Sequence, residues 1–216
     1  MTITAARLTQ PDVVEVYSAT APVYDFWGGL TETRAREKAL ALARIRDGEA
    51  VLEVAVGTGL TFLEILKANP SGENVGIDLT PAMLARAQRK AARSGVKNYQ
   101  LTIGDAFALQ FPNRHFDLLM NSYMFDLLPE NDFLAVLAEF KRVLKPGGRL
   151  VLVNMTHGEH FYQRFWEALY QLNPRWLGGC RGVLLHEYLQ TAGFENLHRE
   201  MLSQFGFPSE IITATL

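Results

Sequence analysis

The residues best suited to chemistry lie in a glycine-containing turn after a short apolar run. The run Val51-Leu-Glu-Val-Ala-Val-Gly-Thr-Gly59 leads straight into a segment with helical spacing. Glycine lets the backbone turn tightly there and lets a ligand approach the main chain at the carboxyl end of a parallel strand. Asp78 follows Glu53 by 25 residues and ends the next apolar run. An acid in that place can accept hydrogen bonds from both ribose hydroxyls of an adenosine cofactor.

The dinucleotide fingerprint G-x-G-x-x-G fits this turn poorly. If the pattern starts at Gly57, its third glycine falls on Phe62, so a pyrophosphate would lack its usual cradle. A nucleotide-dependent oxidoreductase is therefore an alternative that the turn itself disfavours.

The elements that position this turn alternate along the chain. Short runs rich in branched apolar residues predict strands, and apolar residues three and four positions apart predict helices. Thr80-Pro81 is typical of a helix start, and residues 94–95 and 145–148 are typical of helix ends. The predicted strands are 50–55, 74–78, 99–103, 116–120 and 149–154, and the predicted helices are 60–68, 81–94 and 133–144. Such alternation predicts an α/β fold, with a parallel sheet that carries helices on both faces.

The two ends of the chain follow a different pattern. The first 47 residues have helical spacing and contain no strand candidate. After Asn154 come an aromatic helical stretch at 160–172, a helix at 183–192 and two strand-like runs at 195–202 and 207–216. A short glycine-containing connection joins the two runs, so we expect an antiparallel hairpin that closes a seven-stranded, mostly parallel sheet.

Five elements in register along the chain resemble the class I S-adenosylmethionine-dependent methyltransferases. Their first motif reads approximately D/E-x-G-x-G-x-G, and here Ala55 stands where the family has its first glycine. The matching elements are Glu53-Val-Ala55-Val-Gly57-Thr-Gly59, Gly76-Ile-Asp78-Leu-Thr-Pro-Ala-Met-Leu84, Gly104-Asp105-Ala106, Phe116-Asp117-Leu-Leu-Met-Asn121 and Arg142-Val-Leu-Lys-Pro-Gly-Gly-Arg-Leu150.

Within this family the chain is similar to the ubiquinone and menaquinone C-methyltransferases and to the bacterial phosphatidylethanolamine N-methyltransferases. The segment Ala21-Pro-Val-Tyr24-Asp25 resembles the A-x-x-Y-D segment that these enzymes fold over the cofactor. The resemblance implies a Rossmann-like sheet in a single domain of residues 1–216. Residues 1–47 would form a helical lid, 48–155 the cofactor-binding core, and 156–216 the acceptor-side helices and closing hairpin.

The resemblance also implies a cofactor and the residues that hold it. The cofactor would be S-adenosyl-L-methionine, which leaves as S-adenosyl-L-homocysteine. Asp78 would bind the ribose, Asp105 and Ala106 the adenine, and Tyr24 would close over the site. The full set of expected cofactor-binding residues is Tyr24, Glu53, Ala55, Gly57, Thr58, Gly59, Asp78, Leu79, Asp105, Ala106 and Asn121.

Three residues are catalytic candidates. Tyr123 and Asp126 follow the fourth strand, on the loop that faces the transferable methyl group in this family. A tyrosine face can contact the sulfonium cation, and a hydroxyl or carboxylate can orient or deprotonate an acceptor; packing in an amphipathic core is the alternative for Tyr123. His157, after the fifth strand, is a candidate base or an ordinary surface histidine, as is His160. The stripe of aromatic residues that begins at Phe161 is either core or an acceptor wall.

Composition excludes several other classes of protein. The chain has 216 residues, of which 48% are hydrophobic and 20% charged, and this predicts one folded domain. A net charge of −2 gives no global basic field, so nucleic acid is not expected as a partner. The single cysteine, Cys180, excludes a disulfide framework, a multi-cysteine zinc cage and an iron–sulfur cluster, and it argues against arsenic or radical chemistry. We expect no bound metal.

The predicted activity is methyl transfer to a small hydrophobic or lipid-like acceptor, either an ethanolamine-phospholipid amine or a quinone-type ring. A nucleotide-dependent oxidoreductase and a non-catalytic S-adenosylmethionine-binding module are the alternatives. The chain shows no signal-peptide core and no apolar window near the ~18 residues of a membrane span, so a cytoplasmic location is expected. Arg34, Arg36, Lys38, Arg44 and Arg46 form either a solvated helix face or a weak footing for peripheral membrane contact. The oligomeric state stays open.

Overall fold

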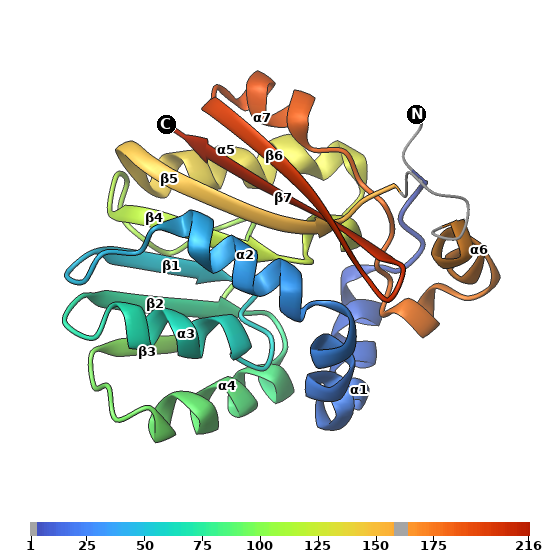
Figure 1. The fold of residues 1–216 in the computed structure, drawn as a ribbon, viewed down its shortest axis with the longest axis horizontal. Helices are drawn as coiled ribbons and strands as arrows, with labels where there is room; N and C mark the ends of the chain where they lie inside the picture. The colour runs from blue at the N-terminus through green and yellow to red at the C-terminus, as the bar shows by residue number, and fades with distance from the viewer. Residues whose placement is uncertain (1–3, 158–163) are drawn as a thin grey trace.

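The protein contains a seven-stranded sheet (Figure 1). The structure is a computed structural model, and it describes residues 4–157 and 164–216. The strand order is β3-β2-β1-β4-β5-β7-β6. Strands β1 to β5 pair in parallel, and β7 pairs antiparallel with both β5 and β6. The strands are β1 (Ala50–Val54), β2 (Glu73–Asp78), β3 (Tyr99–Ile103), β4 (Phe116–Ser122), β5 (Leu144–Met155), β6 (Glu195–Gln204) and β7 (Phe207–Thr215). The predicted α/β class, the mostly parallel sheet and the antiparallel hairpin are confirmed.

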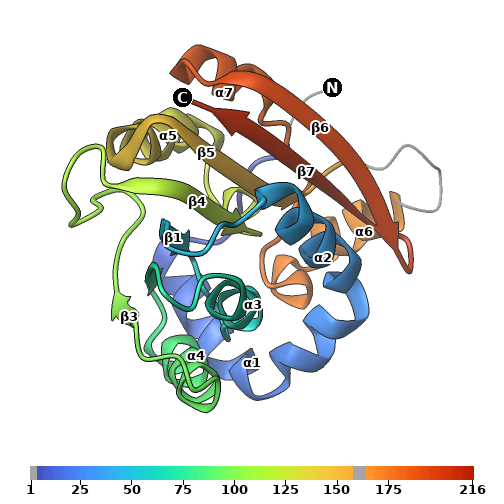
Figure 2. The ribbon, with the colours of Figure 1, turned by 60° about the vertical axis from the view of Figure 1, so that its left-hand side comes forward.

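Helices cover both faces of this sheet (Figure 2). Each face has its own cluster of buried apolar side chains. On one face α2, α3 and α4 pack on the sheet, and on the other α5 and α7. Alanines at 35, 39 and 43 lie on one side of α2 at four-residue spacing, which lets this helix approach the sheet closely. The α-helices are α1 (Gln10–Thr31), α2 (Thr33–Ala43), α3 (Leu60–Ala68), α4 (Pro81–Arg93), α5 (Phe133–Val143), α6 (Arg164–Leu172) and α7 (His186–Ala192).

Most element boundaries lie within two residues of the prediction, but two elements begin farther away from it. Strand β5 begins at Leu144, directly after α5, and not at residue 149. Its pairing with β4 shifts register between Leu144 and Arg149, so the Pro-Gly-Gly segment forms an irregular start of the strand rather than a free helix end. The predicted helix at 183–192 begins only at His186. Residues 160–163 of the predicted aromatic helix, including His160 and Phe161, lie outside the described residues.

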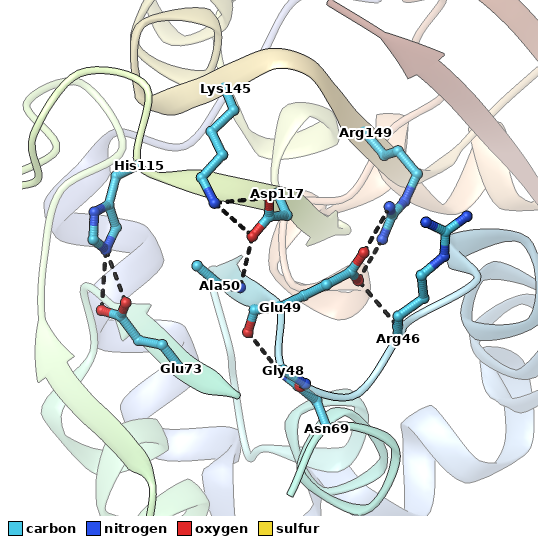
Figure 3. Close-up of polar contacts among 10 residues, drawn as sticks. All are labelled: Arg46, Gly48, Glu49, Ala50, Asn69, Glu73, His115, Asp117, Lys145 and Arg149. Carbon is cyan, nitrogen blue, oxygen red and sulfur yellow. Dashed lines mark hydrogen bonds and ion pairs between the residues drawn. The ribbon is translucent and has the colours of Figure 1, made fainter. Parts of the chain in front are cut away.

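The amino ends of the parallel strands are tied together by polar side chains (Figure 3). Arg149 on β5 donates to both carboxylate oxygens of Glu49, at 2.9 and 2.6 Å. Lys145 lies 2.8 Å from each oxygen of Asp117, which also accepts the backbone N–H of Ala50. The fully buried Asn69 accepts from the N–H of Gly48 and donates to the carbonyl of Glu49 and to Asn74. These contacts fix the spacing of β1, β2, β4 and β5 at this end.

The carboxyl ends of β1, β2 and β4 point toward the side of the molecule where α1 lies (Figure 1). Thr9 caps α1 with a reciprocal pair of hydrogen bonds to Asp12, and Pro22 lies in the helix interior. Because proline lacks an N–H and crowds the preceding turn, α1 is locally weakened at that point. Among the described residues no helix is long and apolar enough to cross a bilayer.

Candidate functional site

A cavity of about 480 Å³ opens between the carboxyl ends of the parallel strands and the helix α1. Its wall combines backbone from the glycine turn after β1, acidic strand ends, and apolar side chains from the N-terminal segment and the loop after β4. The wall residues used below are Tyr17, Tyr24, Ala55, Gly57, Asp78, Leu79, Asp105, Ala106, Phe107, Tyr123, Leu127 and Leu128. A site at this end of a parallel sheet agrees with the general position of ligands in open α/β folds.

Asp78 occupies the place predicted for a ribose ligand. One carboxylate oxygen accepts the N–H of Gly57 at 2.7 Å, and the other accepts the N–H of Thr80 at 2.8 Å. Burial raises the pKa of Asp78, although the backbone N–H groups of Thr80 and Gly57 favour its ionised form. A carboxylate oxygen can accept more than one hydrogen bond, so both oxygens keep capacity for donors in the cavity.

The glycine turn adopts a left-handed backbone at three of its positions. The φ angles are +59° at Ala55, +58° at Gly57 and +83° at Gly59. A Cβ at Gly57 would meet open space, whereas one at Gly59 would come 2.8 Å from Ala87 on α4. Gly59 therefore serves the packing of α3 against α4, and Ala55 carries a side chain where the backbone favours glycine.

Asp105 and Ala106 lie where β3 ends, as predicted. The carboxylate of Asp105 accepts the N–H of Phe107 at 3.0 Å and the side-chain amide of Gln10 at 3.3 Å. The second contact joins the start of α1 to the end of β3. With Leu79 from the end of β2, these residues bring apolar and polar atoms to one part of the cavity wall.

A smaller cavity of about 50 Å³ adjoins the first and shares Tyr24, Ala55, Gly57 and Tyr123 with it. Glu53, Glu32 and Arg36 line it. Glu53 is only 2% exposed, and its Oε2 has no hydrogen-bond partner among the described residues. Burial, and then the nearby Asp78, raise the pKa of Glu53 well above its usual range. A buried carboxyl oxygen without a partner is costly unless a bound group satisfies it.

Glu32 and Arg36 are site residues that sequence reasoning missed. Burial is the main cause that raises the pKa of Glu32 to about 7; the charge of Asp126 adds to it and that of Arg36 opposes it. The hydroxyl of Tyr24 lies 3.4 Å from Glu32. The four-residue spacing of Glu32 and Arg36 is a signal for a facing pair on a helix, but the charged pattern of this segment is equally typical of a solvated or membrane-facing surface.

Tyr24 and Tyr123 both line the two cavities. The Tyr123 hydroxyl lies 2.8 Å from that of Ser209 on β7, and its ring contacts Phe207 with centroids 6.0 Å apart. Burial raises the pKa of both tyrosines well above 10. Tyr123 also has a φ of +53°, which is strained for an aromatic residue and often accompanies a functional position.

Thr58, Asn121, Asp126 and His157 do not line the main cavity. Thr58 is in the wall of the small cavity, with its hydroxyl directed to Asp25 at 2.5 Å. Asn121 is fully buried and donates to the carbonyl of Val54 at 2.9 Å, which ties β4 to β1.

Asp126 is fully buried behind the cavity, where it accepts the N–H of Met155 at 3.1 Å. Burial is the main cause that raises its pKa to about 7, against the backbone hydrogen bond from Met155 and the charge of Arg181. His157 lies at the end of β5 against Gly182 and is not part of either cavity wall. The structure thus brings Tyr123, but neither of the other two catalytic candidates, to the cavity.

Comparison with known proteins gives a consistent picture. A family model for a methyltransferase domain matches residues 51–148. A demethylmenaquinone methyltransferase of Lactobacillus johnsonii is 31% identical over 96% of this chain and 89% of its own length. One of Lactococcus lactis subsp. lactis is 30% identical over 84% of this chain and 74% of its own length.

The fold has solved counterparts as well. The crystal structure of the cyclase SpnF matches with a TM-score of 0.77 and 20% identity, covering 99% of this chain and 97% of that one. At this identity the match speaks for the fold alone, since one fold hosts several reactions. The sequence comparisons favour neither an oxidoreductase nor a non-catalytic binding module. The chain belongs to the class I methyltransferases, which take their methyl group from S-adenosylmethionine, in the group that includes the demethylmenaquinone methyltransferases.

Proposed function

We propose that this enzyme methylates a ring carbon of a quinone-type acceptor in its reduced, phenolic form. The observation that carries the proposal is the 31% identity to a demethylmenaquinone methyltransferase over 96% of the chain. Leu127 and Leu128 add apolar surface to the cavity wall beside Tyr123, which suits a flat, apolar ring. The relatives described above offer no comparable support for an ethanolamine headgroup.

The cavity residues fit S-adenosylmethionine part by part. Asp78 would accept the two ribose hydroxyls, because its oxygens keep hydrogen-bonding capacity toward the cavity. Asp105 and Ala106 would hold the adenine, with Leu79 packed on the ring. The buried Oε2 of Glu53, which has no partner among the described residues, suits the ammonium group of the methionine part.

The bound cofactor supplies an already activated methyl group, so the demands on the protein are alignment and exclusion of water. Tyr123 would place the acceptor, since its ring lines the cavity and its hydroxyl is held by Ser209. A tyrosine hydroxyl is protonated at neutral pH, and burial raises the pKa of this one further, so it would act as a hydrogen-bond partner and not as a base. Removal of the phenol proton by Asp126 or His157 stays a prediction.

Methyl transfer from labelled S-adenosylmethionine tests the acceptor directly. Purified enzyme is incubated with a short-chain demethylmenaquinone kept reduced, with phosphatidylethanolamine vesicles, and with both. We expect label in the quinone fraction in the first and third reactions. If only phosphatidylethanolamine is labelled, the acceptor is the phospholipid amine and not the quinone ring. If neither compound is labelled, both proposed acceptors are wrong.

We also propose a peripheral contact with the membrane that carries such an acceptor. The apolar patch that we propose for this contact consists of Phe26, Leu30, Phe165 and Phe205, of which Phe26 and Phe205 are 78% and 77% exposed. The side chain of Gln204 donates to the carbonyl of Leu30 and so holds the β6–β7 turn against the end of α1. Aromatic contacts continue inward from Phe165 through Trp166 and Phe207 to Tyr123 in the cavity wall.

Sedimentation with vesicles tests this contact. The exposed Arg34 adjoins the patch, so we expect tighter binding to vesicles that contain phosphatidylglycerol than to phosphatidylcholine alone. The double variant Phe26→Ser and Phe205→Ser should lose most of that binding. Leu134→Ser removes an exposed leucine from α5, on the other face of the sheet, and is the matched control. Equal binding by the double variant and the control would contradict the patch.

A further inference from the structure

Asp25 joins three elements of the site although it belongs to neither cavity wall. Its carboxylate on α1 accepts the hydroxyl of Thr58, in the glycine turn, at 2.5 Å. It also accepts the ammonium of Lys90, on α4, at 2.8 Å. The same ammonium donates to the backbone carbonyl of Thr58 at 2.8 Å. Three groups far apart in the sequence therefore meet at one point behind the glycine turn.

The helix that carries Asp25 has a weakened backbone on both sides of this point. Pro22 interrupts its backbone hydrogen bonds one turn earlier, and Gly28 and Gly29 follow one turn later. Phe26 and Leu30, on the same stretch, are exposed to solvent and add little packing. A helix with such a sequence depends on side-chain contacts to hold a fixed place.

The neighbour of Asp25 explains why this place matters. Tyr24 lines both cavities, and residues of the glycine turn line them as well. The place of Tyr24 relative to the turn therefore depends on the contacts that join α1 to the turn. Asp25 makes that connection through Thr58, whose side chain is buried.

We propose that Asp25 is a positioning residue for S-adenosylmethionine, which fixes α1 and the glycine turn at the separation that the cofactor requires. The proposal rests on the identity of the cofactor and not on that of the acceptor. Lys90 and Thr58 hold the pKa of Asp25 below its usual value in spite of partial burial, so the carboxylate is charged at neutral pH. A charged acceptor strengthens both hydrogen bonds.

Calorimetric titration with S-adenosylmethionine alone, without any acceptor, measures the effect. For Asp25→Asn we expect the Kd to rise about fivefold, a modest change because the pair is partly exposed and solvent weakens it. Asp117→Asn breaks the equivalent carboxylate–lysine pair at the amino ends of the strands and should leave the Kd unchanged.

Hydrogen exchange measured by mass spectrometry separates positioning from general destabilisation. Without cofactor, Asp25→Asn should speed exchange in peptides from residues 18–31 and 56–60, while β4 and β5 stay as protected as in the unchanged protein. Thr58→Val, which removes the hydroxyl but keeps the shape, should weaken binding similarly. The variant that carries both Asp25→Asn and Thr58→Val should bind S-adenosylmethionine no more weakly than the more affected single variant.

Two results would overturn the proposal. One is a Kd for Asp25→Asn that equals that of Asp117→Asn. The other is weaker binding with unchanged exchange in residues 18–31, which would mean that the charge of Asp25 acts on the cofactor directly. Neither result depends on the quinone acceptor, whose failure would appear only in the methyl-transfer assay.

Discussion

The two ends of the parallel strands are built in opposite ways. At the amino ends, Arg149 and Lys145 each meet both oxygens of a carboxylate (Figure 3). At the carboxyl ends, Glu53 and Asn121 each keep a buried oxygen without a partner among the described residues. Left-handed backbone does not separate the two ends, because Arg44 and Arg114 precede β1 and β4 just as Ala55 and Tyr123 follow them. The contrast therefore lies in the pairing of these polar side chains, which is complete at the amino ends and incomplete at the cavity.

The same contrast appears in the carboxyl groups. Burial alone would raise the pKa of Glu49 and of Asp117, but hydrogen bonds from Arg149 and Lys145 outweigh it and lower both values. At the other end, burial dominates and raises the pKa of Glu32 to about 7. Hydrogen bonds therefore stabilise the ionised carboxylates at the amino ends. Beside the cavity the ionised form of Glu32 lacks such stabilisation, which a cationic group of a ligand would provide.

The largest effect is expected from Asp78→Ala at the binding end. The substitution removes the proposed acceptor for both ribose hydroxyls, and hydrogen bonds to a charged group contribute more than neutral ones. The Kd for S-adenosylmethionine should rise about a hundredfold, near 3 kcal/mol, in a calorimetric titration. An unchanged Kd would show that Asp78, at the carboxyl ends of the strands, does not contribute to binding of the cofactor.

Asn69→Ala, at the amino ends of the strands, should have the opposite effect: it should lower stability and leave cofactor affinity unchanged. It removes the acceptor of the Gly48 N–H, and it removes one of the hydrogen bonds of the Glu49 carbonyl and of the buried Asn74 side chain. The free energy of unfolding should fall by about 2 kcal/mol, measured by urea denaturation. Cofactor affinity below the unfolding temperature should stay constant. A loss of affinity comparable to that of Asp78→Ala would show that the two ends are not independent.

The pH dependence of stability sharpens the electrostatic contrast. Because the pKa of Glu32 rises on folding, from a usual 4.5 to about 7, the folded state holds an extra proton between these values. The contribution of Glu32 to stability is full below about pH 4.5 and is lost as the pH rises through 7. The free energy of unfolding therefore decreases between pH 5 and 8, and in Glu32→Gln this decrease should be smaller by about 1 to 2 kcal/mol, measured by urea denaturation. The control Glu49→Gln, whose parent carboxyl has a lowered pKa, should lose stability above pH 5 instead.

The smallest effect is expected from Ala55→Gly. Its φ of +59° costs an alanine about 1 kcal/mol relative to glycine, and the greater freedom of glycine in the unfolded chain offsets part of the gain. The free energy of unfolding, measured by urea denaturation, should rise by no more than about 0.5 kcal/mol. A decrease would mean that the methyl group of Ala55 makes packing contacts that outweigh the strain.

The sequence was sufficient for the elements that depend on local patterns. The branched apolar runs at β1 and β4 are buried strands, and Asp78 and Asp105 lie at strand ends in the cavity wall, because parallel topology brings such ends together. Ala55 was recognised as a departure from glycine, although its φ angle needed the structure.

Residues whose surroundings come from distant segments were not predictable in this way. Arg36 lies on a helix of ordinary charged pattern and reaches a cavity wall only because α1 and α2 meet beside Tyr24. Asp126 follows β4 directly, yet Arg181, which donates to the carbonyls of Asp126 and Leu128, helps to enclose it. Spacing along the chain carries no information about such enclosure.

The place of β7 inside the sheet has a consequence for folding. Its pairing with β6 closes through the turn at Phe205 and Gly206, both left-handed, whereas its pairing with β5 joins segments much farther apart in the chain. Local pairing closes a shorter loop, so we expect the β6–β7 hairpin to form first and to dock onto β5 as a unit. Until it docks, β5 offers an open row of backbone groups that a second molecule can occupy. Refolding at high concentration should therefore lose material to association through β5.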